Sequence, residues 1–225
     1  MSGNAPERNE AVAESAAAAV RYLAEHGFES TTVGDLADAI GISRSTFFRR
    51  FRSKEDVIFA DHDLALARLE ELLSDTELTP SEALSRSTVE VLHTLVRDTH
   101  AARLRWELLR QNPSLREREM VITHRYERVF VEYLNRVAPP GAPQWAPVAL
   151  AASLVAVHNA ALRRWLRDSD TRALGALDRE LRELTAQFAP WFADEGRSRR
   201  VVVAAFDPGA SSAEIARAIE SQLGG

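Results

Sequence analysis

Two short helical segments on either side of Gly41 constrain the fold of this chain more than any other sequence feature. Thr32 is a good N-cap for a helix over Val33–Ile40, and Ser43 is a good N-cap for a helix over Arg44–Phe51. The glycine permits the tight turn that brings two such helices together. The pattern therefore predicts a helix-turn-helix.

The apolar residues of this motif have the spacing to pack on one another and on a preceding helix. That helix is predicted from about Glu7 to Glu25, and Gly27 is a signal for its end. Its apolar stripe is Ala13, Ala17, Val20 and Ala24. The motif contributes Val33, Leu36, Ala37, Ile40, Ile42, Phe47 and Phe51. We expect a compact three-helix domain over residues 7–60.

The chain beyond this motif is predicted to be a helical bundle, because glycine and proline are sparse and apolar residues keep a helical period. Ser53, with Asp56 three residues later, begins a helix expected to reach about Leu73. Further helices are expected over Ser81–Asp98, Ala101–Arg110, Leu115–Val137, Trp145–Arg167 and Thr171–Phe192. The fold class is therefore all-α, with a second domain over residues 61–195.

The final segment, residues 196–225, differs in composition from the bundle. The β-branched run from Arg200 to Phe206 predicts a short strand. Ser211 and Glu214 form a capping box for a last helix to about Leu223. A single strand needs a partner for its backbone groups, and pairing with a second copy of the chain is one interpretation.

Composition excludes several classes of protein. None of the 225 residues is cysteine, which excludes disulfides, zinc-binding thiolates and a thiol nucleophile. No basic segment followed by an apolar run marks a secretory signal at the amino terminus, and Ala11–Ala24 is too short and polar to span a bilayer. We expect a cytoplasmic protein that does not enter a membrane. The six histidines include no His-x-x-x-His pair, so no metal and no cofactor is predicted.

Basic residues gather in one place in a chain of net charge −5. Between Ser43 and Lys54 there is no Asp or Glu. The cations of this segment are Arg44, Arg49, Arg50, Arg52 and Lys54. Such a run is either a solvated helix face or a face that meets phosphates. A helix that begins with Arg, Ser and Thr has the groups to contact base edges in a major groove.

The segments from His26 to Val33 and from Phe51 to Asp56, with the helix-turn-helix between them, resemble the N-terminal domain of TetR-family transcriptional regulators. The resemblance covers roughly residues 10–62. A glycine, paired threonines, the helix-turn-helix, a terminal aromatic residue and Ser-Lys-Glu occur in register, which makes the match specific.

This resemblance implies roles for individual residues. Thr32 and Lys54 would each hold a backbone phosphate, and the start of the recognition helix would face the bases. Phe48 stands where the family usually has tyrosine, so one phosphate-bound hydroxyl is lost, and Arg50 stands where histidine or tyrosine is common. The predicted DNA-contacting residues are Thr32, Ser43, Arg44, Ser45, Thr46, Phe48, Arg49, Arg50 and Lys54.

The family resemblance also implies a C-terminal domain that forms a homodimer and encloses a small-molecule effector. Helices Trp145–Arg167 and Thr171–Phe192 would pack against their copies as a four-helix bundle. Their apolar residues are Leu150, Leu154, Val157, Ala161, Leu174, Leu177, Leu181, Leu184 and Phe188.

The C-terminal part further resembles actinobacterial regulators of the mycofactocin type, in Arg105–Leu109, His124–Tyr126 and Asn159–Leu166. That resemblance implies a long-chain acyl-CoA effector, in an apolar tube with arginines for the phosphates. The candidate arginines are Arg103, Arg105, Arg125 and Arg163. The predicted ligand-binding residues are Trp106, Leu109, Met120, His124, Tyr126, Val155, His158 and Asn159. The polar members, His124, His158 and Asn159, are equally well explained as satisfied groups inside a bundle.

The sequence therefore predicts a repressor that an acyl-CoA or another apolar ligand releases from its double-stranded DNA operator. A ligand-controlled activator and a DNA-binding protein without an effector are the alternatives. An enzyme is not expected, because no phosphate-binding glycine loop, nucleophile elbow or zinc-protease motif occurs.

Overall fold

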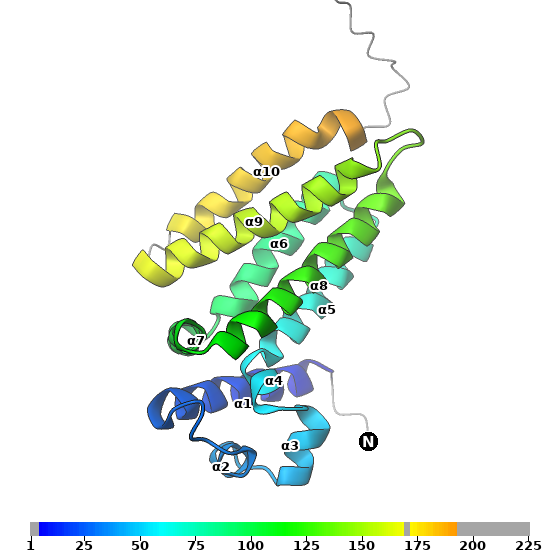
Figure 1. Cartoon of the computed structure of the whole chain (residues 1–225). Helices are drawn as coiled ribbons and strands as arrows, with labels where there is room; N and C mark the ends of the chain where they lie inside the picture. The colour runs from blue at the N-terminus through cyan, green and yellow to red at the C-terminus, as the bar shows by residue number, and fades with distance from the viewer. Residues whose placement is uncertain (1–4, 169–171, 193–225) are drawn as a thin grey trace, which may run out of the picture. The chain divides into compact units, whose positions relative to one another are not determined.

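The computed structural model describes residues 5–168 and 172–192, and within these ranges the chain forms ten α-helices and no strand (Figure 1). They are α1 Ala5–His26, α2 Val33–Ala39, α3 Arg44–Arg50, α4 Lys54–Ile58, α5 Ala60–Ser74, α6 Pro80–Val96, α7 Thr99–Gln111, α8 Pro113–Val137, α9 Trp145–Asp168 and α10 Arg172–Phe192. The all-α class is confirmed. The strand and helix expected after residue 200 lie outside the described residues.

The predicted caps set the boundaries of the helix-turn-helix. Thr32 accepts a hydrogen bond from the Asp35 amide at 3.2 Å, and the Asp35 carboxylate accepts one from the Thr32 amide at 2.8 Å. Hydrogen bonds from Thr32 hold the pKa of Asp35 below its usual value. Ser43 accepts from the Thr46 amide, and Gly41 has φ of +70°, which glycine adopts without strain. These local interactions confirm the helix-turn-helix.

The core beneath this motif is made by α1 to α4. Phe47, Leu36 and Ala37 are fully buried, as expected, and the Phe47 ring packs edge-on against that of Phe51. One residue of the expected α1 stripe is wrong, because Ala24 is exposed. Leu23, one position earlier, fills the core instead. Near the end of α1, the helix directs the Leu23 side chain toward the core and the Ala24 side chain toward solvent.

The single helix expected from Ser53 to Leu73 is in fact two, and this prediction is wrong. α4 ends at Ile58, the following Phe59 has φ and ψ of −105° and 14°, and α5 begins at Ala60. The Phe59 and His62 amides each donate to a carbonyl three residues back, at 3.3 and 3.0 Å. The break lets α4 pack on α1 while α5 joins the bundle.

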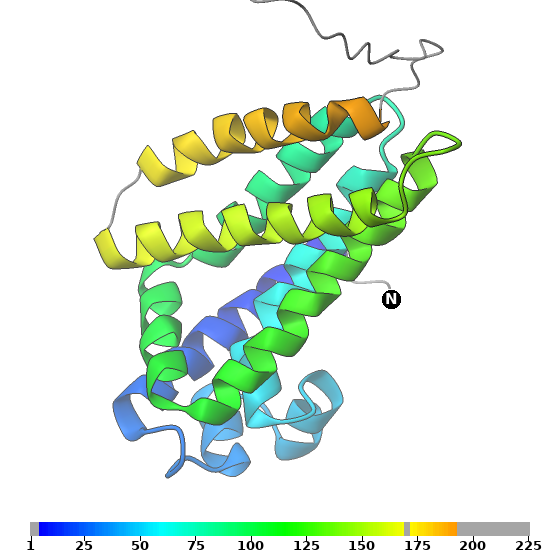
Figure 2. The same cartoon turned by 45° about the horizontal axis from the view of Figure 1, so that its top comes forward.

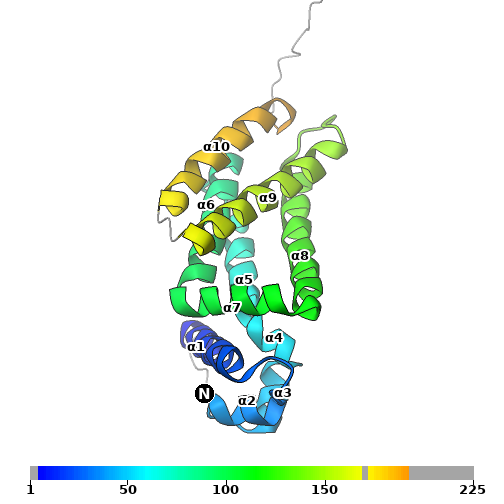
Figure 3. The ribbon, with the colours of Figure 1, turned by 60° about the vertical axis from the view of Figure 1, so that its left-hand side comes forward.

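Helices α5 to α10 form the bundle. α9 and α10 run side by side, and α10 also packs on α6 (Figure 2). α7 crosses the end of this bundle and lies against α1 (Figure 3). An ion pair between Arg21 on α1 and Asp98 at the start of α7, 2.8 Å apart, joins the two groups of helices.

One described helix, α9, is long and apolar enough to cross a membrane by length and composition. Its inner face packs into the bundle, with Leu150 and Leu154 fully buried. Core helices of globular proteins meet the same criterion, so α9 carries no membrane assignment.

Candidate functional site

The recognition-helix candidate α3 presents cations and an aromatic ring to solvent. Arg44, Arg49 and Arg50 are exposed, and half of the Phe48 side chain is exposed. Arg44 has no hydrogen bond or ion pair among the described residues. Arg50 reaches back to the Ser15 hydroxyl on α1 at 3.2 Å. Arg44 is therefore the residue best placed to meet a partner outside the chain.

Other predicted DNA contacts already have partners inside the chain. The hydroxyls of Thr32 and Ser43 cap α2 and α3. Thr46 accepts a hydrogen bond from Ser43, and the Ser45 hydroxyl lies 3.0 Å from that of Ser43. Arg49 lies 3.5 Å from the Thr46 hydroxyl. These groups form a polar edge at the start of α3.

Lys54 binds the loop that connects α1 and α2. Its ammonium donates to the carbonyl oxygens of Phe28 and Thr31, at 2.6 and 3.3 Å, and it lies 4.2 Å from the centre of the Phe28 ring. Lys54 thereby fixes the loop between α1 and α2. The sequence did not signal this role, because the carbonyls come from residues more than twenty positions earlier.

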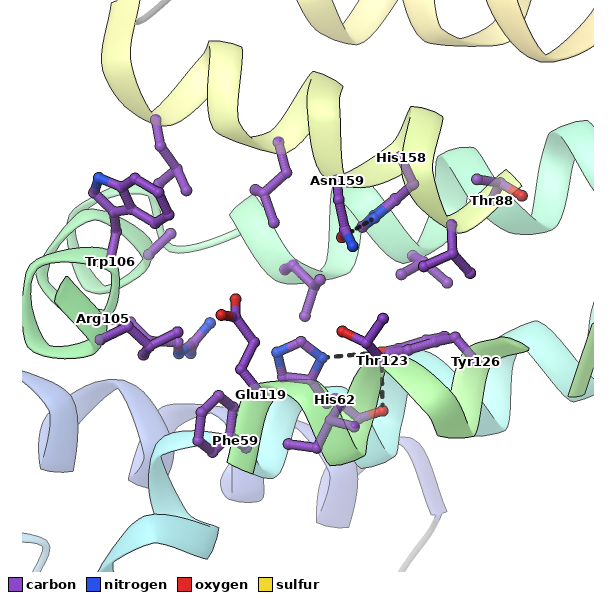
Figure 4. Close-up of a pocket in the computed structure, with 18 of the residues that line it drawn as sticks. Phe59, His62, Thr88, Arg105, Trp106, Glu119, Thr123, Tyr126, His158 and Asn159 are labelled. Carbon is purple, nitrogen blue, oxygen red and sulfur yellow. Dashed lines mark hydrogen bonds between the residues drawn. The ribbon is translucent and has the colours of Figure 1, made fainter. Parts of the chain in front are cut away.

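A cavity lies inside the bundle, between α5, α6, α7, α8 and α9 (Figure 4). It encloses about 790 Å³ of space, part of it open to solvent, and its wall is mostly apolar. His158 and Asn159 project into it from α9, opposite His62 and Tyr126 (Figure 4).

Six of the eight predicted ligand-binding residues line this cavity: Trp106, Leu109, Tyr126, Val155, His158 and Asn159. Met120 and His124 do not line it, so the prediction is wrong for these two residues. Met120 is 64% exposed, and the His124 side chain is 73% exposed and pairs with Glu127. Both lie on the outer face of α8, whereas Glu119, Ile122 and Thr123 on the inner face line the cavity.

Sequence reasoning missed polar residues that the fold brings to the cavity. His62 contacts Tyr126 through Nδ1 and the tyrosine hydroxyl at 3.1 Å, and Glu119 faces the same space. Arg105, proposed above for phosphate, instead forms an interior ion pair with Asp61 at 2.6 Å. Burial raises the pKa of Asp61, and the Arg105 guanidinium opposes that shift. The two residues are 44 positions apart in the sequence, so the ion pair becomes evident only in the folded chain.

Burial favours the uncharged forms of the cavity's titratable groups. It lowers the pKa of His62 to about 3 and that of His158 to about 4, and it raises the pKa of Glu119 above its usual value. Both imidazoles are therefore neutral at pH 7. Among the described residues, no three His, Asp or Glu side chains are grouped as a metal site would need.

The low pKa of His158 predicts a loss of stability in mild acid. Below its ordinary pKa of 6.5 the unfolded chain binds a proton, whereas the folded chain stays unprotonated down to about pH 4. Stability therefore falls as pH falls through this window, by about 1 kcal/mol for this residue between pH 7 and 5.5. Urea unfolding of wild type and His158→Phe at both pH values measures it. An equal pH dependence in the two proteins would contradict the assignment.

Arginines surround a second hollow that adjoins the cavity. The two spaces share Trp106, Glu119 and Leu162, among other residues, and the second adds Arg110, Arg116 and Arg163. All three arginines are exposed. Arg116 donates to the Arg110 carbonyl at 2.7 Å, at the end of α7. The cavity therefore opens toward a basic rim.

Of the four arginines that the sequence proposed for phosphates, only Arg163 lies at this rim. Arg105 is held in the interior by Asp61, and Arg125 pairs with Asp63 at 2.8 Å. The Arg103 guanidinium lies 5.5 Å from the centre of the Trp165 ring. Arg110 and Arg116 reach the rim because α7 ends and α8 begins there, which the sequence pattern did not show.

Comparison with protein families matches both parts of the chain. Residues 16–60 match the family model "Bacterial regulatory proteins, tetR family", and residues 78–189 match the "MftR C-terminal domain". The first range contains the helix-turn-helix, and the second contains most of the cavity wall.

Individual proteins agree with these models. A Mycobacterium tuberculosis protein named as the mycofactocin biosynthesis transcriptional regulator MftR is 30% identical over 164 residues, 70% of this chain and 82% of that protein. The HTH-type transcriptional repressor AcnR of Corynebacterium diphtheriae is 30% identical over 54% of this chain and 62% of its own length.

The fold also matches solved structures. The transcriptional regulator FadR of Bacillus subtilis, solved in complex with stearoyl-CoA, superposes with a TM-score of 0.55 at 20% identity, over 78% of this chain and 96% of that one. The family models and the match to MftR show that the chain belongs to the TetR family of bacterial transcriptional regulators.

Proposed function

We propose that this regulator is a homodimeric repressor that binds its operator through α3 and leaves it when a long-chain acyl-CoA enters the bundle. Residues 7–60 would bind DNA, and residues 61–195 would dimerise and bind the effector. The observation that carries the effector proposal is the apolar cavity with its rim of arginines.

The exposed face of α3 supports DNA binding. It combines Arg44, Ser45, Arg49 and Arg50 at one surface in a chain whose net charge is −5. Local positive charge on an acidic protein favours one docking face over general adhesion to nucleic acid. In a two-fold dimer, two such helices would contact successive major grooves about 34 Å apart.

Arg44→Ala is expected to weaken operator binding by roughly 1–3 kcal/mol, because Arg44 would make a bidentate contact with a guanine. Binding to random DNA should change much less. Arg128→Ala removes an exposed cation from α8 and should leave both affinities unchanged. Fluorescence anisotropy with operator and random duplexes measures all of them. Equal losses on the two duplexes would reassign Arg44 to a phosphate.

The dimer face needs a correction relative to the sequence expectation. Leu150, Leu154, Leu177 and Leu181 are fully buried within the chain, so they cannot contact a second copy. α9 instead exposes small apolar side chains at helical spacing: Val148, Ala152, Ala156 and Ala160. Small residues allow two helices to approach closely. We propose this stripe, with the outer face of α10, as the subunit contact.

Ala156→Asp should convert the dimer to a monomer without unfolding it, because the residue is exposed at the centre of the stripe. Analytical ultracentrifugation and circular dichroism measure the two properties. Ala186→Asp, also exposed but on α10, tests whether the contact extends to that helix. A dimer unchanged by both substitutions would place the interface elsewhere.

Two further observations support an acyl-CoA as effector. A fatty acyl chain matches an apolar cavity, and phosphates match the exposed guanidinium groups of Arg110, Arg116 and Arg163. FadR, which shares the fold, was solved with stearoyl-CoA, and residues 78–189 match the MftR C-terminal domain. Binding would alter the separation of the two α3 helices and thereby favour release from DNA.

A gel-shift assay on DNA upstream of the protein's own gene tests the proposal, with palmitoyl-CoA, free CoA or no addition. Release by palmitoyl-CoA, but not by CoA, supports a ligand-released repressor. Stronger binding with palmitoyl-CoA supports the alternative of a ligand-dependent DNA binder such as an activator. DNA binding that ignores both compounds removes the acyl-CoA from the proposal.

A further inference from the structure

His158 stands in the cavity wall with one ring nitrogen unsatisfied. The residue is 7% exposed and projects from the middle of α9 (Figure 4). Its Nδ1 lies 3.2 Å from the Asn159 carboxamide oxygen. Its Nε2 is buried and has no hydrogen-bond partner among the described residues. A buried polar atom without a partner is rare in proteins and calls for an explanation, and in the wall of a cavity a bound ligand supplies one.

The Asn159 contact fixes the chemistry of that nitrogen. A carboxamide oxygen only accepts hydrogen bonds, so Nδ1 of His158 must carry the hydrogen. Burial lowers the pKa of His158 to about 4, so the ring holds a single hydrogen at pH 7. Nε2 is then a bare acceptor. This nitrogen can form a hydrogen bond only with a donor group, and neither a carbonyl group nor a hydrocarbon chain is a donor.

His62 lies opposite His158 in the same cavity (Figure 4). Its Nδ1 lies 3.1 Å from the Tyr126 hydroxyl, which also lies 3.3 Å from the His62 carbonyl oxygen. Either tautomer of the neutral His62 ring fits these contacts. The bare acceptor at Nε2 of His158 therefore carries the argument for a ligand with a hydrogen-bond donor.

We propose that the effector donates a hydrogen bond, from an O–H or N–H group, to Nε2 of His158. This inference rests on the function proposed above and names the part of the ligand that the cavity recognises. In an acyl-CoA, two parts on the acyl side of the diphosphate carry such donors. The pantetheine arm has amide N–H groups and a hydroxyl, and a 3-hydroxyacyl chain has a hydroxyl of its own.

The distance between His158 and the arginine rim indicates how far inside the cavity the hydrogen-bond donor of the ligand must lie. Arg163 follows it by five residues on α9, which is about 7.5 Å along the helix axis. A ligand whose phosphate meets Arg163 must present its donor roughly that far inside the cavity. The pantetheine arm follows the phosphates directly, so its donors lie nearest this depth. The hydroxyl of a 3-hydroxyacyl chain lies farther from the phosphates, beyond the thioester.

The test compares palmitoyl-CoA with 3-hydroxypalmitoyl-CoA on wild type and His158→Phe by isothermal titration calorimetry. Phenylalanine preserves the ring and removes the acceptor, and we expect about tenfold weaker binding. A loss for both thioesters assigns the donor to the pantetheine arm. A loss for the 3-hydroxy compound alone assigns it to the acyl hydroxyl. His124→Phe, which makes the same substitution on the exposed outer face of α8, should retain wild-type affinity.

Unchanged affinity of His158→Phe for both thioesters overturns the inference and leaves the acyl-CoA proposal standing. No binding of either thioester by the wild type overturns both. Nitrogen NMR of the 15N-histidine-labelled protein gives a readout that packing alone would not move. The Nε2 resonance, assigned by its loss in His158→Phe, should shift when a donor binds, and a saturated complex with an unshifted resonance also refutes the inference.

Discussion

Replacing Phe47 by alanine is expected to lower the free energy of unfolding by about 3–5 kcal/mol. The side chain is fully buried, and its ring packs against those of Phe48 and Phe51 at centroid distances of 6.0 and 5.3 Å. Alanine would leave a cavity where α3 meets α1 and α2. Urea unfolding followed by circular dichroism measures the loss as a lower midpoint.

The neighbouring phenylalanine is a matched control. Phe48 is 50% exposed on the outer face of α3, so Phe48→Ala should change stability by less than about 0.5 kcal/mol. Its effect should appear in operator affinity instead, because the ring lies on the proposed DNA-binding face. If the two substitutions destabilise the protein equally, the orientation of α3 described above is wrong.

Arg105→Leu should cost about 3–5 kcal/mol of stability, because it leaves the Asp61 carboxylate buried without its counter-ion. Both side chains are about 10% exposed, and their ion pair is 2.6 Å long. Adding Asp61→Leu should recover at least half of the loss, since no buried charge then remains. A thermodynamic double-mutant cycle in urea measures the coupling.

The exposed pair Arg125–Asp63 provides the comparison for this cycle. Its side chains are 42% and 65% exposed, so Arg125→Leu should cost no more than about 1 kcal/mol. Similar costs for Arg105→Leu and Arg125→Leu would show that water reaches the Asp61–Arg105 pair. A double variant no more stable than Arg105→Leu would show that the leucines fail to pack there.

The parts of the fold that depend on neighbouring residues could be predicted from the sequence. Thr32 and Ser43 cap their helices through hydrogen bonds that span three residues, and Gly41 takes a backbone angle that its own chemistry favours. The break at Phe59 has no such local signal, because neither glycine nor proline stands near it. It arises from the packing of α4 on α1 and of α5 on the bundle.

The sequence predicted which helices line the cavity, but it did not predict which face of each helix does so. Tyr126 and His158 line the cavity as expected, while Met120 and His124 lie on the far side of α8. Apolar periodicity identifies an inner face, yet it cannot say whether that face meets the same chain or a second copy. For this reason the sequence predicts Leu154 at the dimer contact, whereas the side chain is fully buried within its own chain.

α9 serves three purposes around its circumference. Leu150 and Leu154 fill the core, His158 and Leu162 line the cavity, and Ala156 lies in the exposed stripe proposed for dimerisation. Few of its positions are free to vary without changing the fold, the ligand or the subunit contact. Evolution of a new ligand specificity in such a regulator is therefore expected to alter α7 and α8 first. Substitutions on the cavity-lining faces of these two helices would leave the proposed subunit contact unchanged.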